Sequence, residues 1–558
     1  MTAPSRWAVT PSGCRSPGHT AGVVIAACIL AAPASAPPGP DTHLRAARLD
    51  SSDAAVSLRG DGTALIVGAS GLPTPPPGYL AAANALYLHL GDSADMDAVT
   101  TPQSFWPLTG VMNLTTNESI ARGGQILAAN IENQIAAGTV DAANPLVVFG
   151  YSQGANVETT AMQQIHAAGV PSDAVHFVMV GNPANPDGGF LSRFAVDIDG
   201  AMPTYPALGI TFSGATPTDL YPTDIYTYEY DGFADFPRYP INLLADLNAI
   251  LGMAFNHGGY LSPAAVDSAF LLGTDGLTSY YMIPSETLPL LAPLQFIPFI
   301  GKPLYSLLEP ATAVLVNLGY GCIDNSWCEV PLPDGEPATF ASYGPFPSLD
   351  VDEVLNALWN GLQLGVSNAI ADLQDPSYGP SIMDVPVLRP MLESAYNVVG
   401  ADPSGDPSAI GDLTGDQLWL GIVSQLGADG QAFELLQGAF PGMIPDPPTS
   451  LMGIVNDIAV NIGNDFATLI PIANTVASLF TTIPSLAISF IAQEAQSGNL
   501  FEGLGNAFSA LVGLAPIALG VGTVVPVIEA LAINALNFVE LFDPNALQDL
   551  AALLVDVP

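Results

Sequence analysis

The sequence predicts an α/β fold with a mostly parallel central sheet, followed by a mainly helical C-terminal region. Between residues 62 and 323, short apolar runs alternate with stretches of helical length. This alternation is typical of a parallel sheet that helices cover on both faces. Residues 347–558 are mostly helical by their periodicity. A serine placed directly after the apolar run 146–151 narrows the fold class further.

Each expected strand of the first segment is a short apolar run. These strands are Thr63–Val67, Leu146–Tyr151, Ala174–Gly181 and Asp224–Tyr230. The expected helices between them are Ile120–Ala136 and Val157–Ala168. Loops rich in glycine and proline follow the first and third strands, at 68–75 and 181–189. We therefore expect one sheet with functional loops at the ends of its strands.

The pentapeptide Gly150-Tyr-Ser-Gln-Gly154 follows a strand and opens a helix. This is the context that a Gly-x-Ser-x-Gly nucleophile elbow requires. The turn is strained, so the small residues Gly150 and Gly154 must flank Ser152. The serine hydroxyl then stands above a helix N-terminus, whose N–H groups and positive potential suit an oxyanion. We predict an α/β-hydrolase with Ser152 as its nucleophile.

A serine nucleophile needs a base, and in this fold the chain order is serine, then acid, then histidine. Five of the six histidines are excluded by their place in the chain: His19, His43, His89, His166 and His176. The first three precede the serine, the fourth lies on the helix after it, and the fifth lies in the next strand. His257 lies in a glycine-containing loop that follows a late strand. We predict His257 as the general base.

The acid of the triad should lie just beyond a late strand, where Asp231 and Asp235 are both candidates. Asp231 ends the strand and precedes Gly232, the usual form of such a corner. Asp235 is four residues further on, where it could cap the next helix. We favour Asp231 to hold His257 in the correct tautomer and to stabilise its imidazolium, with Asp235 as the alternative.

The oxyanion hole needs two backbone N–H donors. One comes from Gln153, the residue after the nucleophile, and the other should come from the loop after an early strand. Ser70, in Gly68-Ala-Ser-Gly71, is the candidate there. This chemistry requires no metal ion and no organic cofactor.

The composition is acidic and apolar. Hydrophobic residues make up 49% of the 558 residues, charged residues only 11%, and the net charge is -42, with Lys302 as the only lysine. Such a chain has no electrostatic means of holding nucleic acid, and it is too apolar to be a disordered acidic protein. We expect apolar surfaces that meet lipid. A large alanine-rich core with ordinary acidic solubilisation is the alternative.

Residues 1–36 have the features of an export signal: a basic region, the apolar run Ala21–Ala32 and small residues after it. Cleavage near Ala34 or Ala36 would leave residues 37–61 as a linker rich in proline and alanine. The run Ile25-Ala-Ala-Cys28 also resembles a lipoprotein acylation box, although the apolar run continues past Cys28. We expect the protein to be exported, and either secreted or associated with the cell envelope.

Once the signal is removed, only Cys322 and Cys328 remain. Their short spacing suits a small disulfide loop in an oxidising compartment. A zinc site is not expected, because no second pair of cysteines or histidines lies nearby.

The C-terminal region, residues 324–558, has an unknown role. Its expected helices are Val351–Leu373, Thr414–Gln425, Gln431–Ala439, Leu451–Leu469, Ala477–Ala495 and Phe501–Phe542. Two tracts, Phe466–Gln493 and Gly503–Ile528, carry no charge over the length of a membrane span. Prolines interrupt both tracts, and glycines interrupt the second. We therefore favour buried or membrane-surface helices, with peripheral association, over true spans.

Several separate motifs occur in order along residues 62–323. They are Gly68-Ala-Ser-Gly-Leu-Pro-Thr-Pro75, Gly150-Tyr-Ser-Gln-Gly154, Gly181-Asn-Pro-Ala-Asn-Pro-Asp-Gly-Gly189, Tyr230-Asp-Gly-Phe-Ala-Asp-Phe-Pro237, His257-Gly-Gly-Tyr260, Ile283-Pro-Ser-Glu-Thr-Leu-Pro-Leu-Leu-Ala-Pro293 and Asn317-Leu-Gly-Tyr-Gly321. Together they resemble the PE-PPE domain, a mycobacterial serine α/β-hydrolase module related to cutinases. Through this resemblance, Ser152, Asp231 and His257 match the family triad.

The resemblance implies ester hydrolysis or acyl transfer on lipid substrates, with a sugar such as trehalose as an acceptor. Many family members carry an N-terminal PE or PPE domain for specialised secretion, whereas we expect this chain to use a general export signal. The apolar segment 284–320 is expected to form a lid or an acyl groove. The alternative function is a non-catalytic envelope protein that binds lipid. A peptidase shares the triad but has no support from the composition.

Overall fold

The fold is that of a computed structural model. It describes residues 62–540 apart from 92–93, 139, 143, 197–201, 328–345, 348, 375–381, 402–406, 426–430 and 445–449. The predicted signal (1–36) and linker (37–61), with Cys28, lie outside the described residues, and so does Cys328. The described residues all belong to one compact unit.

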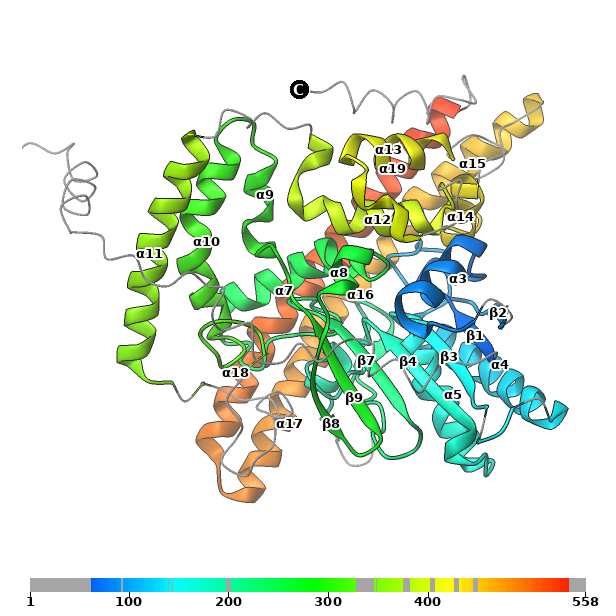
Figure 1. Ribbon diagram of the computed structural model, residues 1–558, viewed down its shortest axis with the longest axis horizontal. Coiled ribbons are helices and arrows are strands. Elements are labelled where there is room, and N and C mark those ends of the chain that lie inside the picture. Colours follow the sequence, from blue (N-terminus) through cyan, green and yellow to red (C-terminus); the bar gives the residue numbers. More distant parts are fainter. Residues whose placement is uncertain are drawn as a thin grey trace, which may run out of the picture. The chain divides into compact units, whose positions relative to one another are not determined.

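A seven-stranded sheet forms the centre of the N-terminal half, in the order β2-β1-β3-β4-β7-β9-β8 (Figure 1). The strands are β1 (Thr63–Val67), β2 (Asp95–Val99), β3 (Leu146–Tyr151), β4 (Val175–Val180), β7 (Thr223–Tyr228), β8 (Phe270–Asp275) and β9 (Thr278–Ile283). All neighbours pair in parallel except β8 and β9, which are antiparallel. The predicted fold class, an α/β-hydrolase type with a mostly parallel sheet, is confirmed.

Alternate residues of the strands pack against helices on opposite faces of this sheet. Leu65 of β1 belongs to the core beneath α4 (Thr116–Ala137) and α5 (Gln153–Ala167). Ile66, its neighbour, belongs to the core beneath α3 (Pro77–Ala83). Because side chains of a strand point alternately to the two faces, a run of consecutive apolar residues fills both cores.

The predicted strands agree with the observed ones to within two residues at either end. Prediction missed β2, β8, β9 and α10 (Gly301–Asn317). It expected a helix after Pro237 without bounds, and this is α7 (Leu243–Phe255), which is capped by Asn242 and not by Asp235. The prolines of the segment 288–319 obscured α10. Pro303 lies in the first turn, where N–H groups have no partner within the helix, and Pro310 lies inside the helix. A helix therefore forms where the sequence suggested an irregular segment.

The C-terminal region is mainly helical, as predicted. Its helices are α11 (Val351–Gln374), α12 (Arg389–Val398), α13 (Gly415–Ser424), α14 (Gln431–Ala439), α15 (Leu451–Ala467), α16 (Leu469–Phe480), α17 (Thr482–Ser497), α18 (Leu500–Leu519) and α19 (Val525–Glu540). Two expected helices were wrong in their bounds. The expected helix 477–495 crosses the break between α16 and α17, where Pro484 offers no N–H in the first turn of α17. The expected helix 501–542 is interrupted by a π-helical turn, Gly520–Val524.

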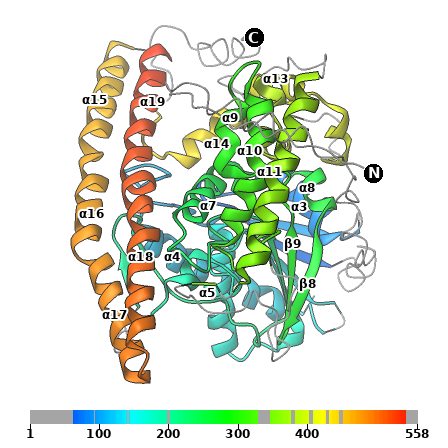
Figure 2. The same ribbon diagram turned by 90° about the vertical axis from the view of Figure 1, so that its left-hand side faces the viewer.

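Helices α15 to α17 follow one another as a long rod, and α18 and α19 return beside them as a second rod (Figure 2). Both rods, Leu451–Gln496 and Leu500–Ala535, are long and apolar enough to cross a membrane by length and composition. In the most apolar 18-residue stretch of each rod, 39% of the residues in the first rod and 33% in the second are buried within the protein. Much of each rod therefore faces outward.

Candidate active site

Ser152 forms a strained turn between β3 and α5. Its backbone has φ 60° and ψ -115°, which few side chains adopt. A Cβ on Gly150 would lie 2.7 Å from the carbonyl carbon of Gly154, and a Cβ on Gly154 would lie 2.8 Å from the carbonyl oxygen of Gly68. Only glycine fits at either position. The turn lifts the serine side chain off the carboxyl end of the central strand.

The structure brings Ser152, His257 and Asp231 into one hydrogen-bonded series. The Nε2 atom of His257 lies 2.8 Å from Oγ of Ser152, and its Nδ1 atom lies 2.7 Å from Oδ2 of Asp231. These residues come from the end of β3, the turn after α7 and the corner after β7. Asp231 is fully buried and Ser152 is 8% exposed. The arrangement can take the serine proton and stabilise the resulting imidazolium.

Two further donors hold the carboxylate of Asp231. The hydroxyl of Tyr260 donates to Oδ2 at 2.8 Å, and the N–H of Phe233 donates to Oδ1 at 3.0 Å. A buried carboxylate needs several such donors to offset the loss of water. Sequence reasoning did not assign a role to Tyr260, although it closes the motif His257-Gly-Gly-Tyr260.

Aromatic side chains fix the imidazole of His257. The ring of Phe233 lies 4.6 Å from it, centre to centre. The hydroxyl of Tyr151, inside the elbow motif, donates to the carbonyl oxygen of His257. The histidine is therefore held both through its ring and through its backbone, which keeps Nε2 directed at the serine.

Asp235, the alternative acid, is not placed against His257. Its Oδ2 atom accepts the N–H of Tyr230 at 2.8 Å. It lies near the buried guanidinium of Arg193. Burial raises the pKa of Asp235 to about 7. The side chain therefore ties together the corner after β7 instead of orienting the histidine.

Gln153, the predicted oxyanion residue after the serine, is locked through its side chain. Its Nε2 donates to the carbonyl oxygen of Ser104 at 2.7 Å, and Oγ of Ser119 donates to its Oε1 at 3.1 Å. Gln153 is the first residue of α5, so its N–H has no acceptor within the helix. Neither Ser104 nor Ser119 belongs to a motif that could have revealed this support.

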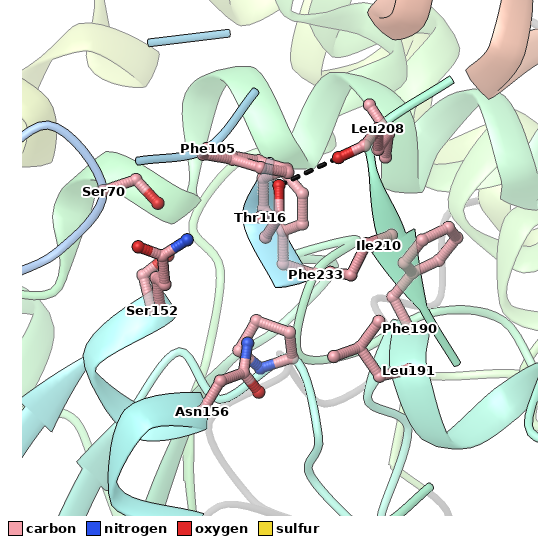
Figure 3. Close-up of a pocket in the computed structure, with 12 residues that line it drawn as sticks. Ser70, Phe105, Thr116, Ser152, Asn156, Phe190, Leu191, Leu208, Ile210 and Phe233 are labelled. Carbon is pink, nitrogen blue, oxygen red and sulfur yellow. Dashed lines mark hydrogen bonds between the residues drawn. The ribbon is translucent and has the colours of Figure 1, made fainter. Parts of the chain in front are cut away.

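Ser70, the second predicted donor, lines the same pocket as Ser152, and its side chain lies on the side of the pocket near Ser152 (Figure 3). The loop that carries it is anchored by the N–H of Gly71, which donates to the carbonyl oxygen of Gln103 at 2.8 Å. This anchor holds Ser70 at the pocket, and its role as the second donor stays a prediction.

An apolar pocket leads away from the serine (Figure 3). Its apolar lining consists of Phe105, Pro183, Phe190, Leu191, Leu208, Ile210 and Phe233. Leu208 and Ile210 belong to a small hairpin, β5 (Thr204–Tyr205) and β6 (Ile210–Thr211), whose turn is held by the hydroxyl of Thr116 donating to the carbonyl oxygen of Leu208 at 2.8 Å. The segment 284–320, expected as a lid or groove, contributes no residue to this lining.

The C-terminal region supports the loop that carries His257. The hydroxyl of Ser394 on α12 accepts the N–H of Leu261 at 3.1 Å, and the amide of Asn397 donates to the carbonyl oxygen of Leu261 at 3.0 Å. Beside them, the hydroxyl of Ser262 donates to Glu393 at 2.5 Å. No motif before residue 324 could have indicated these contacts.

Within the part of the chain that the structure describes, no group of three or more His, Cys, Asp or Glu side chains could hold a metal ion. Cys322 is disulfide-bonded. Its predicted partner, Cys328, lies outside the described residues.

Comparison with known proteins places this fold and site in a family. The PE-PPE domain matches residues 93–321. Esterase PE16 of Mycobacterium tuberculosis (strain ATCC 25618 / H37Rv) is 41% identical over 413 residues, which cover 67% of this chain and 75% of PE16. The chain belongs to the PE-PPE domain family.

Two further relatives of this PE-PPE protein come from the same strain. A PPE family protein, PPE28, is 35% identical over 429 residues, 75% of this chain and 57% of PPE28. Diacyltrehalose acyltransferase Chp2 is 29% identical over 196 residues, 33% of this chain and 52% of Chp2. The chain thus spans a little over half of PPE28 and three quarters of PE16.

Proposed function

We propose that this PE-PPE protein is an exported serine esterase or acyltransferase that acts on acyl esters or lipids of the cell envelope. The observation that carries the proposal is the hydrogen-bonded series of Ser152, His257 and Asp231 beside an apolar pocket. A serine so placed performs acyl transfer in unrelated folds. The printed names of PE16, an esterase, and Chp2, an acyltransferase, support the same chemistry.

In the proposed reaction, His257 takes the proton of Ser152 as the serine oxygen bonds to the acyl carbonyl carbon. The oxyanion accepts hydrogen bonds from the N–H groups of Gln153 and Ser70. His257 then gives its proton to the departing alcohol as the ester bond breaks, which leaves an acyl-serine. Asp231 keeps Nδ1 protonated and stabilises the imidazolium throughout.

The acyl-serine is resolved by water or by a sugar hydroxyl, which His257 deprotonates in turn. The apolar lining by Phe190, Leu208 and Ile210 suits an alkyl chain and keeps water scarce near the acyl group. A dry site favours transfer to an alcohol. Chp2 is named for diacyltrehalose, so trehalose is the acceptor to test first.

The proposal is tested by labelling the purified protein with a fluorophosphonate and locating the adduct by mass spectrometry. We expect an adduct on Ser152 and no labelling of Ser152→Ala. In a second assay, unlabelled protein is incubated with a long-chain acyl ester and trehalose. Free fatty acid and acyl-trehalose are then measured as the two products. A folded protein that takes no label would favour the non-catalytic lipid-binding function instead.

Enlarging one residue of the pocket lining should lower activity on long-chain esters much more than activity on short-chain esters. Ile210→Trp should lower kcat/KM for a long-chain p-nitrophenyl ester by about 10-fold or more, because an added ring fills the space where the alkyl chain packs. The acetyl ester should change by no more than about 3-fold. Ile210→Val, which removes one methyl group, serves as the control and should retain the long-chain substrate. An equal loss on both esters with Ile210→Trp would contradict the pocket assignment.

A further inference from the structure

In α15 and α16 several polar side chains are buried and most of the large apolar side chains are exposed, whereas α17 also buries the apolar residues Ile483, Leu486 and Phe490. Asp457, Asn464, Thr475 and Ser478 are buried against the protein. The large exposed residues on the other side are Leu451, Met452, Val455, Ile458, Ile462, Phe466, Leu469, Ile470, Val476, Phe480 and Ile488. A helix that faces water shows the opposite distribution. Apart from Asn456 and Asp465, the exposed side of α15 and α16 is therefore mostly apolar.

The buried polar side chains connect the rods to each other and to the protein. Thr475 donates to the carbonyl oxygen of Ala518 on α18 at 3.1 Å. The amide of Asn464 donates to the carbonyl oxygen of Met443 at 3.4 Å. Polar residues that bond between helices, with apolar residues outward, are the arrangement of helices in contact with lipid.

The second rod, α18 and α19, buries apolar residues together with the polar residues Asn506 and Ser509. Leu514 and Ile517 are buried in the core beneath it. Its large exposed residues are Leu500, Phe501, Leu504, Phe508, Leu511, Leu519, Val524, Val525, Ile528 and Leu531. The two rods lie side by side (Figure 2), and we call their exposed apolar residues together the apolar face. Monomeric proteins in water rarely expose such a surface.

Two partners could cover the apolar face, a lipid bilayer or a second copy of this chain, and the net charge favours the bilayer. Two identical chains, each with a net charge of -42, would repel one another on approach. An uncharged lipid surface offers no such opposition. The tracts 466–493 and 503–528 carry no charge, and no lysine, arginine or histidine follows Arg389 in the sequence. The apolar face therefore has no means of attracting anionic headgroups either.

We propose that the apolar face of α15–α19 docks along the surface of a lipid bilayer, with its leucine, isoleucine and phenylalanine side chains in the outer hydrocarbon. Each uncharged tract is about 40 Å long as a helix, enough for a long contact parallel to the membrane. Affinity comes from apolar burial, at about 25 cal/mol per Å². It does not come from basic residues.

Docking would place the acyl pocket behind the helices of the apolar face, a consequence that rests on the proposed function. The hydroxyl of Tyr205 on β5 donates to the carbonyl oxygen of Leu514 at 2.8 Å, and that of Thr482 donates to the carbonyl oxygen of Thr204 at 2.7 Å. These bonds join the rods to the hairpin that carries Ile210 into the pocket. The pocket wall is therefore attached to the inner side of the helices that would contact the bilayer.

The test is flotation of the full chain with lipid vesicles, using Ser152→Ala so that binding is measured without catalysis. We expect flotation with phosphatidylcholine vesicles. Addition of phosphatidylglycerol or removal of salt should not increase the bound fraction, because the face has no cations. The triple variant Phe466→Ser, Phe480→Ser, Phe501→Ser should reduce binding about 10-fold or more, since these side chains are 74–83% exposed and removing them leaves the core intact.

The matched control replaces three exposed apolar residues of α11: Leu355→Ser, Trp359→Ser and Leu373→Ser. This control should bind vesicles as the parent does. Equal loss in both triple variants, or binding that requires anionic lipid, would overturn the assignment. Absence of flotation, with a dimer in light scattering that the Phe triple variant abolishes, would assign the face to a second copy instead. If the protein showed no catalysis but still bound vesicles in this way, the proposed function would fail and the docking assignment would stand.

A tryptophan in the apolar face reports its depth. Phe466→Trp should show a blue-shifted emission that brominated acyl chains quench when vesicles are added. Emission that vesicles leave unchanged would overturn the docking geometry.

Discussion

Replacement of Ser152 by alanine is expected to lower kcat/KM for a soluble acyl ester by about 10⁴-fold or more. The hydroxyl is the only group in the pocket lining within reach of Nε2 of His257, at 2.8 Å, and without it no acyl-serine can form. His257→Ala should cause a loss of similar size. Because the two residues act as one unit, the losses should not add, and the activity of the double variant should lie within a few fold of that of either single variant. Initial rates on p-nitrophenyl esters measure all three.

The control for this experiment is His176→Ala. His176 lies on β4 and pairs with Asp224 at 3.0 Å, away from the nucleophile. Its removal should change kcat/KM by no more than about 3-fold. Additive losses in the Ser152 and His257 variants, or a loss in His176→Ala as large as in His257→Ala, would contradict the proposed triad. Melting temperatures of all variants establish that each is folded.

Replacement of Asp231 by asparagine is expected to lower kcat by about 10³- to 10⁴-fold, while Asp235→Asn should lower it by no more than about 10-fold. Oδ2 of Asp231 accepts a hydrogen bond from Nδ1–H of His257 at 2.7 Å. The side-chain amide of an asparagine at position 231 would favour the wrong tautomer of the histidine. Asp235 bonds to the backbone N–H of Tyr230 instead. Both substitutions conserve size, so the comparison isolates the contact with the histidine. Equal losses would contradict the assignment of Asp231 as the orienting acid.

Asp235→Asn should instead change the pH dependence of stability. Burial raises the pKa of Asp235 to about 7, so the folded protein keeps this proton up to higher pH than the unfolded chain does. Its contribution to stability is complete below pH 4 and is lost as the pH rises through about 7. The melting temperature of the variant should therefore fall less between pH 5 and pH 8 than that of the parent. Parallel melting curves would show that Asp235 does not titrate in this range.

Local chemistry made the elbow predictable. Gly150 and Gly154 flank a serine whose backbone must turn back on itself, and no other residues leave space for that turn. The buried strands were predictable too, because short runs of apolar residues bounded by glycine and proline are typical of buried strands. His257 was reached by elimination, from chain order and from the element that carries each histidine. By contrast, α10 was missed because its prolines look like helix breakers, whereas Pro303 occupies a first turn that tolerates it.

The sequence left Asp231 and Asp235 as rival acids because both follow the same strand. Tyr230 adopts φ 63° in the structure, and the corner turns so that Asp231 meets His257 while Asp235 bonds back to Tyr230. That geometry depends on packing around the corner. The support of the histidine loop by Ser394 and Asn397 depends on residues more than 100 positions away.

The amino-acid sequence by itself determined the sheet class, the nucleophile turn and the helical character of the C-terminal region, because each follows from residues close together in the chain. Only the tertiary structure decided which carboxylate meets the histidine, which residues form the pocket, and which apolar side chains of α15–α19 are exposed. Two uncharged helical tracts suit a buried core as well as a lipid surface. The burial of Asn464 and Ser478, with Phe466 and Phe480 exposed, favours the lipid surface that we propose, because it depends on what each side chain packs against.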